Sequence, residues 1–176
     1  MGQDKALMRL ASKTLLECTH ELLQECLKLI YVSIKEDQTG DPVRSKFKLI
    51  IDEYNQSGPM AGILSAHKIH PHSAWLVVAC DMPSLDKQTL AQLIKERDST
   101  FDATAFNSLK DSLPEPLCAI YEPHLLSEIL DNSKLLPSNS PRDLLLQSRV
   151  KFIKTKNPSA LENMNYPADD LSEIES

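Results

Sequence analysis

The sequence predicts a single α/β domain over residues 1–176, in which helices cover both faces of a mainly parallel, Rossmann-like sheet. Apolar runs typical of strands alternate along the chain with apolar residues at helical spacing, and this order produces a three-layer α/β/α arrangement. A chain of 176 residues can bury one core but is short for two domains. Hydrophobic residues make up 41% and charged residues 25%, proportions that agree with an ordinary globular protein.

Each helix is predicted from apolar residues three or four positions apart, and two helices also from a capping residue. Asp86 is available to cap a helix over residues 86–97, and Ser140 precedes a first-turn proline at the start of RDLLLQ. The helical pattern also covers residues 15–27, a segment that begins at Pro59, and residues 122–130. These helices alternate with strands expected at residues 29–34, 47–51, 74–80, 102–106, 117–121 and 150–153.

The two ends of the chain depart from this regular pattern. Domains of this class usually begin with a strand and the turn that leads into the first helix. Here residues 1–5 have no strand pattern and a helical pattern follows soon after them, so we expect a sheet without its first strand. The acidic tail from Asp169 is expected to be a frayed end.

Charge and hydropathy exclude several classes of protein. The formal net charge of −6 argues against nucleic acid as the main partner. No apolar run is long enough to span a bilayer, and residues 3–5 are polar or charged, unlike the start of a secretory signal. We therefore expect a cytoplasmic protein that has no membrane partner. The four cysteines form no C-x-x-C pair and are interpreted as reduced core thiols, with a metal site as the alternative.

Residues 58–83 combine two features of nucleotide-binding proteins. Gly58 and Gly62 flank a turn into an apolar helix with Pro59 in its first turn, so free N–H groups can face a phosphate or a base edge. The next strand, expected to be fully buried and parallel, ends at Asp81. Ligand and metal chemistry often collects at such a strand end, which makes Asp81 the first functional candidate. The alternatives are a cap or turn role for Asp81, and turn or packing roles for the glycines.

Four further polar residues are candidates for ligand contacts. Lys5 can neutralise phosphate as a mobile charge, or it is a surface lysine near the terminus. Asp52 ends the strand at residues 47–51, where it can accept hydrogen bonds from a base or ribose, or cap a turn. Asn163 and Asn165 have amide side chains suited to ligand contact, but from composition alone a turn before the nearby proline is favoured.

An ordered set of motifs extends over nearly the whole chain. MGQDK, GPMAGI, CDMP, PEPLCAIYEP and NMNYP follow one another at plausible spacing, from Met1 to about Leu171. Together they resemble the molybdenum cofactor guanylyltransferase family, whose members join GMP from GTP to molybdopterin. PEPLCAIYEP is the motif that best separates this family from sugar-phosphate nucleotidyltransferases of similar fold. The resemblance implies an NTP-transferase-like domain with GTP and molybdopterin as substrates, Mg²⁺ as cofactor, and transient contacts with cofactor-biosynthesis or acceptor proteins.

The resemblance also implies which residues bind the nucleotide. Lys5 contacts the phosphates, and Gly2 is the last residue of the motif that lies against them. Gly58 and Gly62 lie against the guanine or its ribose. Asp52 matches a nucleotide-associated aspartate, although its spacing to the glycines differs by about one residue from the family pattern.

On the metal and pterin sides, the resemblance makes Asp81 the Mg²⁺ ligand and, with Lys5, a catalytic residue. Asn163 and Asn165 match paired asparagines that face the pterin. Tyr166 departs from the family here, because a threonine is usual at its position.

The larger departure from the family is at the front. Members carry a glycine-rich phosphate loop of the L-A-G-G-x-S-x-R-M-G type, of which only Met1 and Gly2 match. The rest of the loop would supply backbone N–H groups for the triphosphate and an arginine that offsets its charge. We expect either a start codon placed at an internal methionine, which is favoured, or a truncated relative with weakened activity. The alternative functions are cytidylyl or other nucleotidyl transfer, and a non-catalytic module that binds the pterin.

Overall fold

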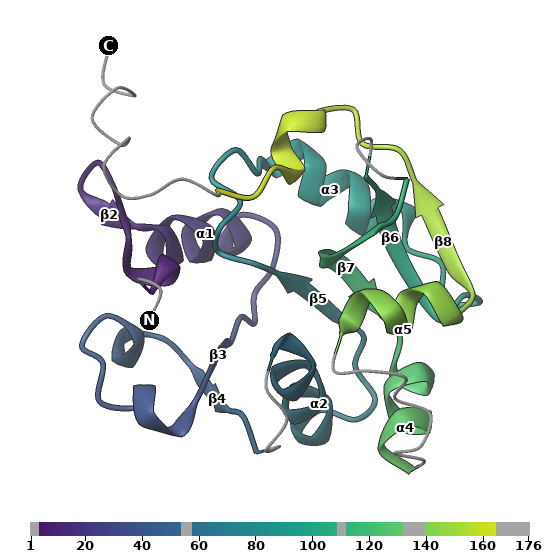
Figure 1. Ribbon diagram of the computed structural model, residues 1–176, viewed down its shortest axis with the longest axis horizontal. Coiled ribbons are helices and arrows are strands. Elements are labelled where there is room, and N and C mark those ends of the chain that lie inside the picture. Colours follow the sequence, from purple (N-terminus) through teal and green to yellow (C-terminus); the bar gives the residue numbers. More distant parts are fainter. Residues whose placement is uncertain (1–3, 54–57, 109–111, 132–139, 165–176) are drawn as a thin grey trace.

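The computed structural model describes residues 4–53, 58–108, 112–131 and 140–164 (Figure 1). Its α-helices are α1 (Leu15–Gln24), α2 (Pro59–Ile69), α3 (Lys87–Glu96), α4 (Pro123–Asp131) and α5 (Pro141–Gln147). The strands are β1 (Arg9–Leu10), β2 (Lys13–Thr14), β3 (Val32–Ile34), β4 (Leu49–Ile51), β5 (Trp75–Val78), β6 (Ala103–Asn107), β7 (Pro114–Tyr121) and β8 (Val150–Ile153). The short 3₁₀ helices are η1 (Lys5–Leu7), η2 (Glu36–Gln38), η3 (Arg44–Lys46) and η5 (Pro158–Leu161).

The largest sheet has four strands in the order β5-β7-β6-β8. β7 is antiparallel to both of its neighbours, whereas β6 and β8 are parallel, so β5, β6 and β8 run in one direction. β3 and β4 form a separate parallel pair, and β1 and β2 form a small antiparallel hairpin that was not predicted. The predicted α/β class with a mainly parallel arrangement is confirmed, with β7 as the reversed strand.

The four-stranded sheet is the middle of three layers. Successive side chains of β7 point to opposite faces, and each face has its own hydrophobic core. Ala119 and Tyr121 belong to the core that includes side chains from α2, α4 and α5. Cys118 and Ile120 belong to the other core, with side chains from α3 and partly buried ones from α1. Figure 1 shows the two helical layers on either side of the strands, as the sequence predicts.

Local hydrogen bonds explain where the helices begin. Thr14 accepts a hydrogen bond from the backbone N–H of Glu17 at 3.2 Å, and the Glu17 carboxylate accepts one from the N–H of Thr14 at 2.9 Å. This reciprocal capping box starts α1. Asp86 caps α3 through the N–H of Thr89 at 2.7 Å, and Ser140 caps α5. The predicted capping roles of Asp86 and Ser140 are therefore confirmed.

The strand predicted at residues 74–80 differs from β5 in burial and pairing. Its four residues, Trp75–Val78, are only partly buried, although full burial was expected. The neighbour to which β5 is hydrogen-bonded, β7, runs antiparallel to it, although a parallel neighbour was expected. The partial burial arises because β5 is the end strand of its sheet and borders a cavity, and the antiparallel pairing arises because β7 runs opposite to both of its neighbours.

Other differences concern the bounds of elements. The helix expected at residues 15–27 ends at Gln24. Of the strand expected at residues 29–34, only β3 (Val32–Ile34) forms a regular strand. β7 begins at Pro114, before the predicted residues 117–121, and its first residues pair with β6 across a shift in register. Prolines are tolerated next to such irregularities because the regular hydrogen bonds are interrupted there.

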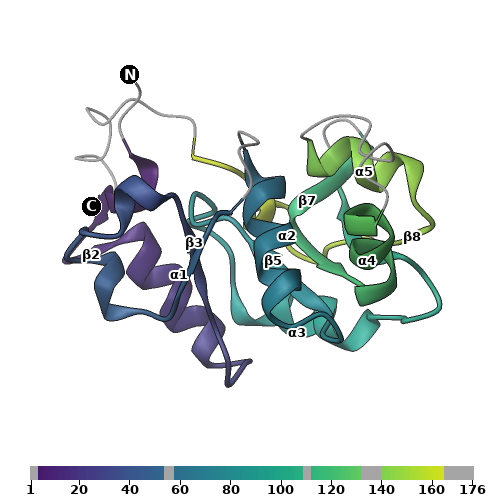
Figure 2. The same ribbon diagram turned by 90° about the horizontal axis from the view of Figure 1, so that it is seen from below.

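β3 and β5 are the facing strands of two separate strand groups. No strand in the part of the chain that the structure describes pairs with the inner edge of either. In Figure 2 α1, β2 and β3 lie to one side of α2 and β5, and β7, β8, α4 and α5 lie to the other side. Among the described residues, the strands therefore form two groups that are not hydrogen-bonded to each other at β3 and β5.

Within the described ranges, none of the helices is long and apolar enough to cross a membrane. The acidic tail predicted from Asp169 lies outside the described residues.

Candidate functional site

Lys5, Asp81 and Met164 meet at the carboxyl end of β5, although they come from three distant parts of the chain. The Lys5 ammonium lies 3.4 Å from the Asp81 carboxylate and donates a hydrogen bond to the carbonyl of Met164 at 2.9 Å. The backbone N–H of Met164 in turn donates to the carbonyl of Asp81 at 2.8 Å. We call this cluster of three residues the Lys5–Asp81 junction. It brings together the two residues that the sequence predicts to be catalytic.

Local structure on each segment positions the junction. Asp81 lies three residues beyond Val78, the last residue of β5, and the chain then turns so that the N–H of Leu85 bonds to the carbonyl of Met82. Lys5 opens η1, whose first turn is capped by the Asp4 carboxylate through the N–H of Ala6 at 3.2 Å. Both charged side chains remain accessible, with Lys5 46% and Asp81 22% exposed. A ligand can therefore reach this ion pair.

Arg44 is a second cation beside the junction, and the sequence prediction did not include it. Its side chain is only 6% exposed and forms ion pairs with Asp4 at 2.7 Å and with Asp41 at 3.4 Å. Because Asp4 caps the turn that carries Lys5, Arg44 holds that turn in place. The sequence gives little indication that Arg44 belongs to a site, because it lies in a polar segment whose composition is typical of turns.

Gly62 is packed against Ser33 and Asp52, and this contact explains why the position carries a glycine. A Cβ atom at Gly62 would lie 2.1 Å from the Ser33 Oγ and 3.2 Å from Asp52 Oδ1. Ser33 Oγ donates a hydrogen bond to that same oxygen at 2.6 Å. Burial raises the pKa of Asp52, and the Ser33 hydrogen bond opposes that rise. The structure therefore shows that Gly62 has a packing role, which was one of the alternatives that the sequence left open.

Gly58 has a different structural role from Gly62. It is the exposed N-cap of α2 and has φ 114°, a left-handed conformation that favours glycine. Pro59 follows at the first helical position, as predicted. The predicted free N–H groups are not found at this helix end: Pro59 has none, Met60 and Ala61 are buried, and the N–H of Ala61 donates to the carbonyl of Gly58 at 3.2 Å.

The asparagines predicted on the pterin side are only partly described. Asn163 is exposed and precedes Met164, so it lies next to the Lys5–Asp81 junction along the chain. Asn165 and Gly2 lie outside the described residues. Of these three predicted residues, the structure therefore places only Asn163 near the junction.

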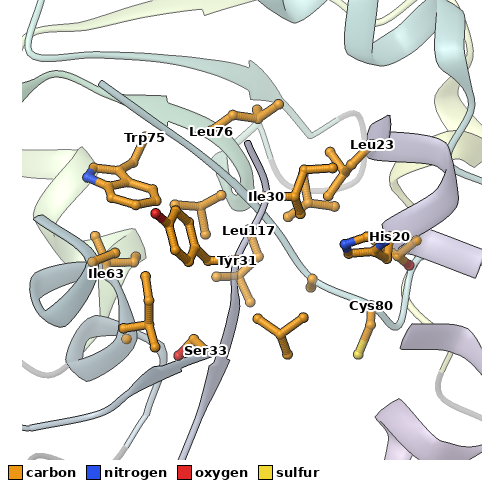
Figure 3. A pocket seen from close by; sticks show the side chains of 18 of the residues that line it. His20, Leu23, Ile30, Tyr31, Ser33, Ile63, Trp75, Leu76, Cys80 and Leu117 are labelled. Carbon is orange, nitrogen blue, oxygen red and sulfur yellow. The ribbon is translucent and has the colours of Figure 1, made fainter. Parts of the chain in front are cut away.

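One cavity of about 750 Å³ is bordered by the junction and by the Gly62 contact. Figure 3 shows apolar side chains around its middle, from α1, α2, β5, β7 and the segment just before β3. Lys5, Asp81 and Arg44 line its charged end, and Gly62 and Ser33 line its β3 side. Burial, followed by the charge of Asp81, raises the pKa of the cavity-lining Cys80 to about 11, so its thiol is protonated at neutral pH.

The donor set at Asp81 limits the kind of metal it can hold. Within the described ranges, no group of three or more His, Cys, Asp or Glu side chains is arranged to hold a metal ion. Mg²⁺ is commonly bound by one or two carboxylates while waters and substrate phosphates supply the remaining oxygens. Asp81 fits Mg²⁺ in this form, as a single carboxylate beside an accessible cavity.

Comparison with known sequences gives a consistent result over almost the whole chain. Residues 1–151 match the family described as MobA-like NTP transferase domain. A probable molybdenum cofactor guanylyltransferase of Bacillus subtilis is 27% identical over 180 residues, which cover 99% of this chain and 87% of that protein. A molybdenum cofactor biosynthesis bifunctional protein of Synechocystis is 26% identical over 169 residues, which cover 96% of this chain. The chain spans about half of that relative, 48% of its length.

The fold is similar to that of a solved structure, molybdopterin-guanine dinucleotide biosynthesis protein A from Archaeoglobus fulgidus. The TM-score is 0.77 at 24% sequence identity, and the match covers 99% of this chain and 90% of that one.

Proposed function

The chain belongs to the family of MobA-like NTP transferase domains, and from this premise we propose that it transfers GMP from GTP to molybdopterin. In this reaction a terminal phosphate oxygen of molybdopterin attacks the α-phosphorus of GTP. The new P–O bond forms as the bond between the α-phosphorus and the bridging oxygen breaks, and pyrophosphate leaves with the electron pair. The names of the relatives in Bacillus subtilis and Archaeoglobus fulgidus support these substrates.

The observation that carries the proposal is the Lys5–Asp81 junction. An accessible ammonium and an accessible carboxylate lie 3.4 Å apart at the carboxyl end of β5 and border a cavity. Phosphoryl and nucleotidyl transfer require positioning and charge neutralisation more than covalent work by the protein. Lys5 would steady the phosphates as a point charge, and Asp81 would hold Mg²⁺. When bound, Mg²⁺ offsets negative charge on the phosphate oxygens.

The guanine side of the proposed site is formed around the start of α2. The exposed Gly58 backbone at the N-cap of α2 would lie against the base or the ribose. The Asp52 carboxylate, held by Ser33, can accept from the donors of guanine or ribose. Asn163, which is exposed beside Met164, would contact the pterin.

The test measures GMP transfer by the chain as it exists, with GTP, molybdopterin and Mg²⁺. Asp81→Asn keeps the shape of the side chain and removes its charge, and the expected loss in rate is about 10²-fold or more, typical of losing one electrostatic contact in a transferase site. The matched control is Glu128→Gln, an equally conservative change at an exposed residue of α4. An Asp81→Asn variant with the rate and Mg²⁺ requirement of the parent chain would show that the metal assignment is wrong.

Substrate choice is tested in the same assay by replacing GTP with CTP. Turnover of CTP at a rate equal to or above that of GTP would assign the chain to cytidylyl transfer. Calorimetric titration with molybdopterin and with GTP separates a transferase from a binding module. Binding of the pterin without binding of GTP would favour the module and would contradict the proposal.

A further inference from the structure

Arg44 is a buried arginine in the loop that carries η3, and contacts within that loop fix its position. Its side chain is 6% exposed. Asp41 accepts hydrogen bonds from the backbone N–H groups of Val43 at 3.0 Å and Arg44 at 2.8 Å, and its other oxygen lies 3.4 Å from the Arg44 guanidinium. Burying a charge is costly unless it is paired, so these contacts indicate that the place of the guanidinium is closely determined.

A second set of contacts holds the same loop against α1. The Lys46 ammonium lies 2.9 Å from the carboxylate of Glu17, which stands in the first turn of α1. The next residue, Phe47, packs its ring against His20 of the same helix, with the ring centroids 4.4 Å apart. The loop is therefore held by α1, and Arg44 is held by the loop.

Arg44 reaches Lys5 through Asp4. One oxygen of the Asp4 carboxylate accepts a hydrogen bond from the Arg44 guanidinium at 2.7 Å, and the other accepts one from the N–H of Ala6 at 3.2 Å. The second of these bonds caps η1, and Lys5 is the first residue of η1. The Lys5 ammonium then lies 3.4 Å from the Asp81 carboxylate. Charges of alternating sign therefore connect Arg44 to the Lys5–Asp81 junction.

Lys5 needs this support because its side chain is long and accessible. A lysine side chain has a flexible four-carbon stem, and fixing it costs conformational entropy. The Lys5 side chain is 46% exposed, and an ion pair with such exposure contributes little to holding its two groups together. The position of the ammonium therefore depends on where the backbone of η1 is held, and the contact of Asp4 with buried Arg44 holds it.

We propose that Arg44 is a positioning residue for nucleotidyl transfer. Through Asp4 it holds η1 so that the Lys5 ammonium stands where the nucleotide phosphates bind under the proposed function, on which this inference rests. The Arg44 guanidinium is occupied by two carboxylates, so it acts through Lys5 and does not neutralise the phosphates itself. A misplacement of about 1 Å at a reacting site can lower a rate by about 10²-fold, so the effect is measurable.

The experiment breaks the link at Asp4 and leaves the buried arginine paired with Asp41. Asp4→Asn keeps an oxygen that can cap η1 and removes the charge that holds Arg44. A second variant, Arg44→Lys, keeps the buried charge but loses the planar fork. The matched control is Glu25→Gln, which removes the carboxylate of an exposed ion pair with Lys87 at 3.0 Å.

Each variant is made in the parent chain and in Lys5→Met, and kcat and KM for GTP are measured. In the parent chain Asp4→Asn is expected to lower kcat/KM by about 10-fold, mainly through kcat, because a misplaced ammonium loses its contact with charge that develops during transfer. In Lys5→Met the same change should cost less than about twofold, since no ammonium remains to be positioned. Arg44→Lys should show the same pattern, and Glu25→Gln should cost less than about twofold in both backgrounds.

The place of Lys5 is also measured without any reaction. In protein with ¹³C-labelled lysine, the side-chain NMR signal of Lys5 is identified by its loss in Lys5→Met. Asp4→Asn and Arg44→Lys are expected to move this signal toward those of freely exposed lysines, because the ammonium then samples many positions. Glu25→Gln should leave the signal where it is.

Equal losses of kcat/KM in the two backgrounds would overturn the proposal, because Arg44 and Asp4 would then act independently of Lys5. A Lys5 signal that moves in neither Asp4→Asn nor Arg44→Lys would overturn it as well. A parent chain that transfers no GMP from GTP would contradict the proposed function, while the Lys5 signal would still decide whether Arg44 positions Lys5.

Discussion

Replacing Gly62 with alanine tests whether the contact among α2, β3 and Asp52 is as close as the structure shows. The new Cβ would lie 2.1 Å from Ser33 Oγ, closer than real Cβ atoms approach other atoms, and 3.0 Å from Ser33 Cβ, which is tighter than most Cβ contacts. Relief requires Ser33 to rotate away, which breaks its 2.6 Å hydrogen bond to Asp52. The clash and the lost hydrogen bond destabilise the variant, whereas the higher helix propensity of alanine stabilises it.

The destabilising effect should be the larger one. An overpacked core position costs about 1–3 kcal/mol, and a half-buried carboxylate that loses its hydrogen bond costs about 1–3 kcal/mol more, in part recovered through water. Alanine gains about 1 kcal/mol over glycine from helix propensity. We expect the free energy of unfolding of Gly62→Ala to fall by about 1–4 kcal/mol, which lowers Tm by about 2–4 °C per kcal/mol for a chain of this size.

Urea unfolding of a double-mutant cycle measures this coupling. Ser33→Ala removes the hydroxyl with which the new methyl group collides, so the double variant should lose less stability than the sum of the two single variants. The reasoning would be refuted if Gly62→Ala were as stable as the parent chain or more stable. Strict additivity in the cycle would likewise show that the methyl group does not meet Ser33.

Two further predictions concern ion pairs. The Lys46 side chain, followed by the Thr14 hydrogen bonds, lowers the pKa of Glu17 from 4.5 to about 2. The Glu17 charge therefore stabilises the fold above pH 4.5, and this contribution is lost as the pH falls toward 2. The variant Glu17→Gln keeps a capping side chain but has no charge to lose. In urea titrations its free energy of unfolding should therefore change less between pH 4.5 and pH 2 than that of the parent chain. Arg97 binds the buried Glu122 carboxylate through two hydrogen bonds, at 2.6 and 2.8 Å. Arg97→Ala should lower the free energy of unfolding by about 2–3 kcal/mol, less than for a fully buried pair because Arg97 is 43% exposed. Adding Glu122→Gln removes the unpaired buried charge and should restore part of that stability. A double variant no more stable than Arg97→Ala alone would show that the unpaired charge is not the cause.

Several features of the candidate site could be predicted without the structure. Asp81 stands directly after an apolar run and before a proline, and Gly58 stands directly before a proline that opens a helix. Such signals depend on residues a few positions apart, so they survive in the sequence. The ordered motifs added the transferase family, which the match over residues 1–151 confirms.

Other features of the site required the tertiary structure. Lys5 and Asp81 are 76 positions apart, and the contact of Lys5 with Met164 spans 159 positions. Arg44 was missed because its burial and its ion pair with Asp4 arise only when the loop folds back on residue 4. The close contact of Gly62 with Ser33 likewise joins a helix to a strand that precedes it in the chain.

The sequence by itself determined the class of the fold, the starts of the helices and the carboxylate at the end of β5, because these follow from hydrophobic periodicity and capping within a few residues. Only the tertiary structure decided that β5 pairs with the reversed strand β7 and that a cavity separates it from β3. The reason is physical: any of several apolar runs can form a strand, but which strands become neighbours depends on how the helices pack against both faces of the sheet.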